Sequence, residues 1–554
     1  MSLDQEFAEV IAQGLLRKSV KTCSRWAERY RIMGGQFPGP WSFRYHPWTR
    51  AMHDSATPFN VGMKSAQMGY TETMMNLTFF AMDIKGLNCL YALPNLKPDA
   101  SVFSASRFDP ALELSEHLRV MFSSVKNVDH KRAGAANLWI RGSKSRIGFK
   151  SIDPSLVVLD EVDEMDQDNI QLAYHRTDGQ LAAQIWAIST PTIPEVGIDA
   201  MYQMSNRMRW FFTCPNCWKQ TTLEFPECLV VRGEHINDPD VKKSHVICGL
   251  CKKEIQHSQK VKSQQETGIW IPQAPEVKER DGYYINQLAS CVKEPPRIAI
   301  TAIEAKTKPH AEQELWNSIA GLPHVVAGAR VNDDHLNACM KKARRRMDDP
   351  VPPEFKIKTM GVDVGKMLHF EIDGWLFPKF GPDINFIADC EILKVGEVEH
   401  FSQIVQLARE FKITYLVIDK QPEERAVYDV CCQFIGRAKR CHYARGVGSK
   451  KMIISADEEE HMINVNRTFW LDTSLGRIRT GRIIFPLDLP PLYRVHVKNL
   501  VKKYKTSEDN TDKDDIAIYT KTGPDHYGHA RNYAEMALPL AASFATNQNI
   551  KSFL

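Results

Sequence analysis

A nine-residue stretch decides the fold of the first half of the chain: Met63-Lys64-Ser65-Ala66-Gln67-Met68-Gly69-Tyr70-Thr71. It follows a short apolar segment and precedes a run with helical spacing, as a phosphate-binding loop does. Lys64 stands where the first glycine of the usual motif would be, and Tyr70 follows Gly69 where lysine is normal. We predict that Lys64 reaches the β- and γ-phosphates of ATP, that Gly69 and Tyr70 line the loop, and that Thr71 binds Mg²⁺. A lysine in a turn before a helix is the alternative.

Two later strand ends carry the side chains that an ATPase needs. The apolar run Leu156-Val-Val-Leu is followed by Asp160 and Glu161. We predict that Asp160 holds Mg²⁺ and that Glu161 orients and deprotonates the attacking water. The alternative is a strand that ends in solvated acids. Ser189 and Thr190 end the next strand, and we predict that they sense hydrolysis and transmit it. Because short apolar strands alternate with helical segments, we expect a parallel sheet, and hence a P-loop-type (ASCE) ATPase domain.

Two pairs of cysteines predict a zinc site within an inserted module at 205–290. Cys214 and Cys217 form one CxxC pair, Cys248 and Cys251 form the other, and 30 residues separate the pairs. Each CxxC turn presents two thiolates to one ion, so four together suit tetrahedral Zn²⁺ in a structural zinc ribbon. A reduced, metal-free set of buried cysteines is the alternative.

The second half of the chain predicts a different sheet. A basic and proline-rich stretch ends at Pro353, so we place the first domain at 1–335, a linker at 336–355 and a second domain at 356–554. Three strands (358–363, 368–373 and 385–392), a helix (400–411) and a strand (415–419) predict an RNase H-like domain. Asp363 and Asp419 then lie on neighbouring strands and share divalent metals, Mg²⁺ or Mn²⁺, for phosphodiester cleavage. Carboxylates that merely end strands are the alternative.

Composition excludes some classes of protein and is silent on others. The 554 residues are 43% hydrophobic and 25% charged, with a formal charge of +4. No apolar run approaches the roughly 20 residues of a membrane-spanning helix, so we expect no membrane association. The small net charge does not by itself indicate nucleic-acid binding, which depends on where basic residues cluster.

The loop and strand motifs resemble those of the large terminase subunit of tailed bacteriophages, particularly the lambda-type branch, over nearly the whole chain. That branch also has its lysine at the start of the loop. The resemblance implies that Phe43-Arg44-Tyr45-His46-Pro47-Trp48 is the adenine-contacting segment, with Tyr45 or Trp48 stacked on the base. Glu72 departs from the pattern, because lambda-type loops tend to have a second basic residue there.

The resemblance also implies a third ligand of the nuclease metals. Gly523-Pro524-Asp525-His526-Tyr527-Gly528-His529 resembles the terminase nuclease motif, with His529 in place of its later acid. Asp525 is the expected third ligand, and His526 or His529 is able to bind Mn²⁺ or assist proton transfer.

The function that the resemblance implies is an ATP-driven motor that packages viral DNA and cuts it with a metal-dependent endonuclease. Its expected partners are double-stranded DNA, the small terminase subunit and the portal of the procapsid, on which it would form a homo-oligomeric ring in the host cytoplasm. A helicase-nuclease of repair or recombination would use the same two sites. A zinc-ribbon scaffold with vestigial enzyme motifs is a third reading.

Overall fold

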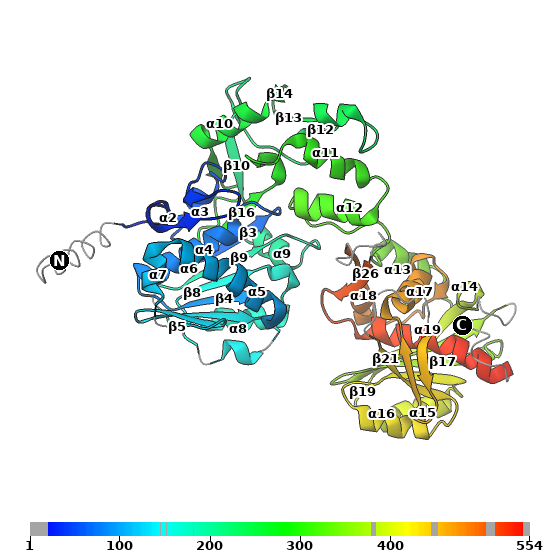
Figure 1. The fold of residues 1–554 in the computed structure, drawn as a ribbon. Helices are drawn as coiled ribbons and strands as arrows, with labels where there is room; N and C mark the ends of the chain where they lie inside the picture. Colours follow the sequence, from blue (N-terminus) through cyan, green and yellow to red (C-terminus); the bar gives the residue numbers. More distant parts are fainter. Residues whose placement is uncertain are drawn as a thin grey trace, which may run out of the picture. The chain divides into compact units, whose positions relative to one another are not determined.

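The computed structural model describes residues 20–123, 125–144, 146–150, 152–180, 182–377, 384–444, 453–505 and 516–546. The chain divides into two compact units, Met1–His324 and Val325–Leu554 (Figure 1). The boundary therefore differs from the expected one at 335. Most of the expected linker, 336–355, packs into the second unit: Leu336, Cys339 and Phe355 are buried in its cores. No helix within the described ranges is long and apolar enough to cross a bilayer.

The first unit is built on a sheet whose central strands are parallel, in the order β10-β16-β3-β9-β8-β4-β7. These strands are β3 (Phe59–Lys64), β4 (Cys89–Leu93), β7 (Ala136–Gly142), β8 (Leu156–Asp160), β9 (Gln184–Ser189), β10 (Met208–Thr213) and β16 (Arg280–Ile285). Antiparallel strands extend both edges: β5 (Val125–Lys126), β6 (His130–Ala133), β11 (Gln220–Thr221) and β15 (Ile269–Ile271).

Helices cover both faces of this sheet because its strands are buried on both sides. In β8, Leu156 and Val158 belong to one core, and Val157 and Leu159 to the other. The first core includes α2 (Cys23–Tyr30), α3 (Thr49–His53), α4 (Tyr70–Asp83), α6 (Asp109–Leu114) and α7 (Glu116–Met121), and the second includes α8 (Gln167–His175) and α9 (Gly197–Gln203). The unit also contains α5 (Ser101–Phe103), α10 (His257–Thr267), α11 (Pro295–Glu304), α12 (Pro309–Glu314), β1 (Ile32–Met33) and β2 (Gly39–Pro40).

The inserted module is smaller than the sequence suggested. β10 and β16, at the two ends of the expected 205–290 segment, are members of the main sheet, and β16 lies directly beside β3. The module between them contains the four cysteines and a separate sheet of β12 (Leu229–Val230), β13 (His245–Ile247) and β14 (Glu254–Ile255). The sequence pattern did not show that 280–285 forms a strand of the main sheet, because its neighbour β3 is distant in the sequence.

The second unit contains a sheet in the order β22-β23-β21-β20-β17-β18-β19-β24. Three antiparallel strands, β17 (Ile357–Val364), β18 (Leu368–Leu376) and β19 (Asp389–Val398), precede α15 (Phe401–Glu410) and β20 (Tyr415–Asp419). β20 pairs parallel to β17, as expected. The expected strand at 385–392 is wrong at its start, because α14 (Ile384–Ile387) precedes β19. The remaining elements are α13 (Asp333–Met340), α16 (Glu424–Cys432), β21 (Ala438–Tyr443), β22 (Ile453–Asp457), β23 (Met462–Val465), α17 (Arg467–Arg479), β24 (Ile483–Ile484), α18 (Pro491–Lys498), β25 (Leu500–Lys505), β26 (Ile516–Lys521) and α19 (His526–Thr546).

Close packing of α19 on β17 positions the second site. α15 and α16 cover one face of the sheet, and α17, α18 and α19 cover the other. A Cβ atom at Gly361 would lie 2.1 Å from the backbone oxygen of Ala530, so only glycine allows α19 to approach β17 this closely. The start of α19 is thereby brought to the end of β17.

A buried ionic network fixes the same helix. The Arg531 guanidinium on α19 pairs with Asp373, Glu371 and Glu535, and all four side chains are fully buried. Arg477 forms a second ion pair with Glu535, with Nη2 2.6 Å from Oε1. Burial raises the pKa of Asp373 well above its ordinary value. Removing Arg531 would leave Glu371 and Asp373 without a countercharge in this network, whereas Glu535 would keep its pair with Arg477.

We predict that Arg531→Ala destabilises the second unit by about 3–5 kcal/mol, because it leaves buried carboxylates without a countercharge. Arg494→Ala is the matched control, since its pair with Asp333 is exposed and contributes less than about 1 kcal/mol. Chemical denaturation of the full chain, followed by the transition of the second unit, measures both. Equal effects of the two substitutions would contradict the structural role of the network.

Candidate nucleotide site and candidate metal sites

Lys64 ends β3 at the edge of the sheet where the other parallel strands also end. Its ammonium lies 2.9 Å from Glu161 Oε1 and 3.5 Å from Thr190 Oγ1. The lysine is only 6% exposed, so a buried positive charge faces the ends of β8 and β9. Open parallel sheets bind ligands at this carboxyl edge. Three of the predicted residues are thus in direct contact.

Asp160 at the end of β8 is buried with an oxygen that is free for a ligand. The Tyr91 hydroxyl donates to its Oδ2 at 2.6 Å, whereas its Oδ1 has no hydrogen-bond partner among the described residues. Burial, and then the charge of Glu161, raise the pKa of Asp160 to about 6, and the Lys64 ammonium and Thr71 hydroxyl oppose this rise. A carboxylate oxygen without a partner beside a threonine hydroxyl fits Mg²⁺, which prefers oxygen ligands.

Glu161 is held in a strained backbone conformation. Its φ of 64° and ψ of 54° lie in the left-handed region, which costs a non-glycine residue on the order of 1 kcal/mol or more. The Ser189 hydroxyl donates to Glu161 Oε2 at 3.4 Å, and the Glu161 amide donates to the carbonyl of Ile188. The end of β9 therefore contacts Glu161 through Ser189 and Lys64 through Thr190.

Two predicted nucleotide-contacting residues are core residues instead. Tyr70 is 1% exposed; it begins α4 with its ring packed against Gly62, and its hydroxyl lies 3.4 Å from the carbonyl of Tyr283. Trp48 is fully buried, and its indole nitrogen donates to the carbonyl of Met68 at 2.9 Å. Both side chains support the loop from behind, so neither can contact a nucleotide. Gly69, with a φ of 81°, makes the left-handed turn before α4, as a loop glycine should.

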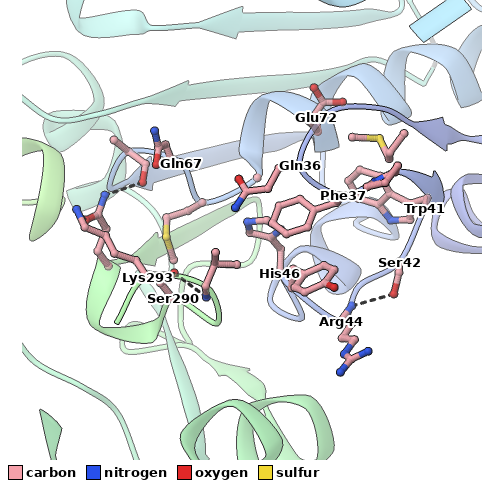
Figure 2. Close-up of a pocket in the computed structure, with 18 of the residues that line it drawn as sticks. Gln36, Phe37, Trp41, Ser42, Arg44, His46, Gln67, Glu72, Ser290 and Lys293 are labelled. Carbon is pink, nitrogen blue, oxygen red and sulfur yellow. Dashed lines mark hydrogen bonds between the residues drawn. The ribbon is translucent and has the colours of Figure 1, made fainter. Parts of the chain in front are cut away.

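A cavity of about 670 Å³ lies beside the loop, and Figure 2 shows the residues that line it. Tyr45 is among them and stacks on Phe37 with ring centroids 4.2 Å apart. His46 lines the same wall, and burial lowers its pKa to about 4, which favours the neutral ring. Loop residues 66–69 also line the cavity, and Gly69 lies directly beside the His46 ring. An aromatic wall beside a phosphate-binding loop suits a nucleobase.

Four basic residues from other segments line the cavity, whereas the loop residues that line it, 66–69, are not basic. The basic residues are Arg44, Arg107, Lys293 and Arg297. Glu72, which stands where a basic residue was expected, pairs with Arg31 at 2.8 Å and with Arg107 at 3.4 Å. Its charge is therefore compensated within the first unit. The sequence did not identify Phe37 or Lys293 as cavity-lining residues. Phe37 stands in the aromatic stretch before Tyr45 and could have been named with it, whereas Lys293 lies far from the loop in the sequence.

The four cysteines converge as predicted from their spacing. One sulfur from each of Cys214, Cys217, Cys248 and Cys251 lies within 4.8 Å of the others. The two CxxC turns are alike: an amide two residues on approaches the first sulfur at 3.4 Å in each, and a left-handed residue follows each second cysteine. Such paired turns fit a tetrahedral ion. Cys228 is buried nearby but is not a member of the set.

Asp363 is the last residue but one of β17, and Asp419 is the last residue of β20, which lies parallel beside it. The residues that precede them, Val362 and Ile418, are paired across the two strands. This register places the two carboxyl groups side by side. Burial, and then the charge of Asp363, raise the pKa of Asp419 to about 6. Both carboxylates face the start of α19.

The side chains that cluster most closely at the start of α19 are not the set that the sequence predicted as metal ligands. Asp363 clusters with His369 and His526, whereas Asp419, Asp525 and His529 are outside that cluster. Asp525 instead pairs with His529 at 3.2 Å, and the hydrogen bond from His529 lowers the pKa of Asp525, although burial acts in the opposite direction. The reason is helical geometry: residues four apart face each other along α19, and His526 is the one aimed at β17. His369 was missed, although apolar and polar residues alternate over 368–373 of its strand.

Together, the parallel sheet, the lysine loop and the Asp160–Glu161 pair define the first unit as an α/β ATPase. Residues 35–270 match the family model described as "Phage terminase large subunit gpA, ATPase domain". This part of the chain is therefore similar to the ATPase domain of phage terminase large subunits. No similar sequence was found among curated proteins.

Several solved structures are similar to the chain at low identity. The HK97 bacteriophage large terminase is 10% identical with a TM-score of 0.48, covering 93% of this chain and 99% of that one. The large terminase from the thermophilic bacteriophage D6E in complex with ADP is 10% identical with a TM-score of 0.29, covering 87% and 94%. Similarities of this size do not by themselves define a function.

We predict that Tyr45→Ala weakens ATP binding about two- to tenfold, because an aromatic stack contributes about 0.5–1.5 kcal/mol. Trp48→Ala instead destabilises the first unit by about 3–5 kcal/mol, since its ring is fully buried. Calorimetric titration with a nucleotide and denaturation of each variant separate the two effects. A stable Trp48→Ala protein with the larger loss of affinity would contradict the assignment.

Proposed function

We propose that the chain is an ATP-driven motor that packages viral DNA and cuts the concatemeric double-stranded substrate with a second site. The observation that carries the motor assignment is the contact of Lys64 with both Glu161 and Thr190 at one sheet edge. The match of residues 35–270 to the terminase ATPase family model supports it. The nuclease assignment rests on the geometry of the second unit.

In the proposed hydrolysis, the phosphates of ATP compete with Glu161 for the Lys64 ammonium. Nucleotide binding would therefore release the Glu161 carboxylate, which then orients and deprotonates the attacking water. Thr71 and Asp160 would hold Mg²⁺, which supplies charge neutralisation at the phosphates when bound. Tyr45 and Phe37 would pack against the base.

The proposed coupling runs from the nucleotide through the end of β9. Ser189 and Thr190 contact Glu161 and Lys64, so both hydroxyls sense the exchange of ion partners. The Ser189 hydroxyl also accepts from the Asp163 amide at 3.2 Å, and Asp163 Oδ1 accepts from the Ile198 amide at 2.7 Å. A hydrogen-bonded path thus joins the site to the start of α9, which would move with hydrolysis.

The second unit is proposed to be an RNase H-like nuclease. The order β19-β18-β17-β20-β21, with the first three strands antiparallel, supports this fold. Asp363 and Asp419 would share divalent metals, Mg²⁺ or Mn²⁺, that activate water for phosphodiester cleavage. Asp525 and His529 would then contact the substrate or complete the metal shell after rearrangement.

The cysteine cluster is proposed to be a structural zinc ribbon. Four protein sulfurs would leave no open position on Zn²⁺, so the ion would stabilise the module and not take part in catalysis. The complete motor would act on double-stranded DNA with the small terminase subunit, as a homo-oligomeric ring on the procapsid portal in the host cytoplasm.

We predict that the two activities separate by mutation. Glu161→Gln lowers kcat of the DNA-stimulated ATPase at least about 100-fold, because the general base is lost, while plasmid cleavage continues. Lys64→Ala has the same effect. Asp419→Asn abolishes cleavage and leaves ATP hydrolysis unchanged. Phosphate release and agarose-gel assays on the same preparations measure both activities, and ATP hydrolysis that survives in both loop-site variants would refute the motor.

We predict one tightly bound Zn²⁺ per chain, measured by elemental analysis of purified protein. Cys248→Ser lowers the zinc content and destabilises the first unit, because the ion holds two distant turns together. Cys228→Ser, in the same module, keeps its zinc. Equal zinc loss in both variants, or none in the wild type, would count against a ribbon.

A further inference from the structure

A row of polar side chains crosses three strands of the second unit. Asp363 on β17 is the cross-strand partner of His369 on β18, and His369 is the partner of Glu397 on β19. Leu368 and Phe370 belong to the opposite core, so His369 points to the face that α19 covers. The row therefore ends in the carboxylate that we assign to the nuclease.

His526 completes a three-residue cluster from the start of α19. Its Nδ1 lies 2.8 Å from Asp363 Oδ2, and its ring stacks on that of His369 with centroids 4.6 Å apart. One ligand atom from each of Asp363, His369 and His526 lies within 4.8 Å of the others. The His526 side chain is 42% exposed, which leaves a path from solvent.

The contacts of the two ring nitrogens of His369 indicate that one of them is available to bind a metal ion. Its Nε2 lies 3.3 Å from Glu397 Oε2, so the carboxylate holds the N–H on that nitrogen. The Nδ1 atom is buried and has no hydrogen-bond partner among the described residues, and the residue is only 7% exposed. Leaving a buried acceptor without a partner is unfavourable, so a ligand at this atom would stabilise it. A histidine whose far nitrogen is fixed by a carboxylate is the usual arrangement of a metal ligand.

We propose that Asp363, His369 and His526 bind one divalent first-row transition-metal ion, represented by Mn²⁺, in preference to Mg²⁺. Two imidazoles and one carboxylate suit such ions, whereas Mg²⁺ prefers oxygen ligands alone. The carboxylate pair of Asp363 and Asp419 is the oxygen-only position. The inference deepens the proposed nuclease site by giving its two metal positions different selectivity, and it rests on that proposal only for the role of the ion.

The test uses the full, zinc-loaded chain without nucleotide, freed of loosely bound metal and titrated with Mn²⁺ in excess Mg²⁺. Paramagnetic resonance measures free and bound Mn²⁺, and electron spin echo modulation from ¹⁴N detects imidazole ligands directly. We expect one bound Mn²⁺ with ¹⁴N modulation. In His369→Ala the affinity falls at least about tenfold, and in the double variant with His526→Ala the ¹⁴N signal is lost.

Matched variants separate the ligands from their surroundings. Asp419→Asn keeps the bound Mn²⁺ and its ¹⁴N signal, because it alters only the oxygen-only position. Glu397→Ala weakens Mn²⁺ binding about 10- to 100-fold, and Glu397→Gln restores part of it, since the amide oxygen still accepts from His369. This partial rescue marks Glu397 as a positioning residue.

Bound Mn²⁺ without ¹⁴N modulation, or affinity unchanged in the double histidine variant, would overturn the inference. Failure of the nuclease proposal gives a different pattern: no metal supports cleavage by the wild type, whereas Mn²⁺ with ¹⁴N modulation is still bound. Cleavage that depends on Asp419 without any nitrogen-ligated Mn²⁺ would leave the nuclease standing and remove only this site.

Discussion

The ion pair between Lys64 and Glu161 is the interaction on which the first site depends. It is possible because β3 and β8 run parallel with only β9 between them, so their last residues meet at one edge. The lysine is buried and would be costly without a countercharge. In the proposed mechanism, the triphosphate of ATP would offer a stronger countercharge, and its binding would release the Glu161 carboxylate. The same edge places Ser189 and Thr190 within reach of both partners.

In the second unit, the position of α19 is the corresponding constraint, and it is set by close packing and by buried charge. Gly361 lets α19 lie against β17, and the Arg531 network fixes the helix by buried charge. Together they bring His526 to Asp363 from far along the chain. A buried network of this kind adds little net stability but is sensitive to loss of one partner. Its position beneath the site indicates that it determines where the first turn of α19 lies.

Local sequence pattern predicted the positions of side chains that stand at strand ends. Lys64, Asp160, Glu161 and Ser189 each stand at the end of an apolar run, and the CxxC spacing predicted the sulfur cluster. Side-chain directions that depend on tertiary packing were not predictable. Tyr70 and Trp48 turn inward because β16 and the strands around it supply a core. β16 itself joins the sheet from far along the sequence. The alternation of apolar and polar residues in β18 shows that His369 lies on the polar side of the strand. Only the register with β17 shows that it lies beside Asp363.

The most direct measurement of the central claim is the entry of DNA into purified procapsids, scored by protection from added nuclease. We expect wild-type protein to protect full-length DNA with ATP, and we expect no protection without ATP or with a non-hydrolysable analogue. Protection of equal extent without hydrolysis, or rapid ATP turnover with no DNA entering the procapsid, would contradict a packaging motor.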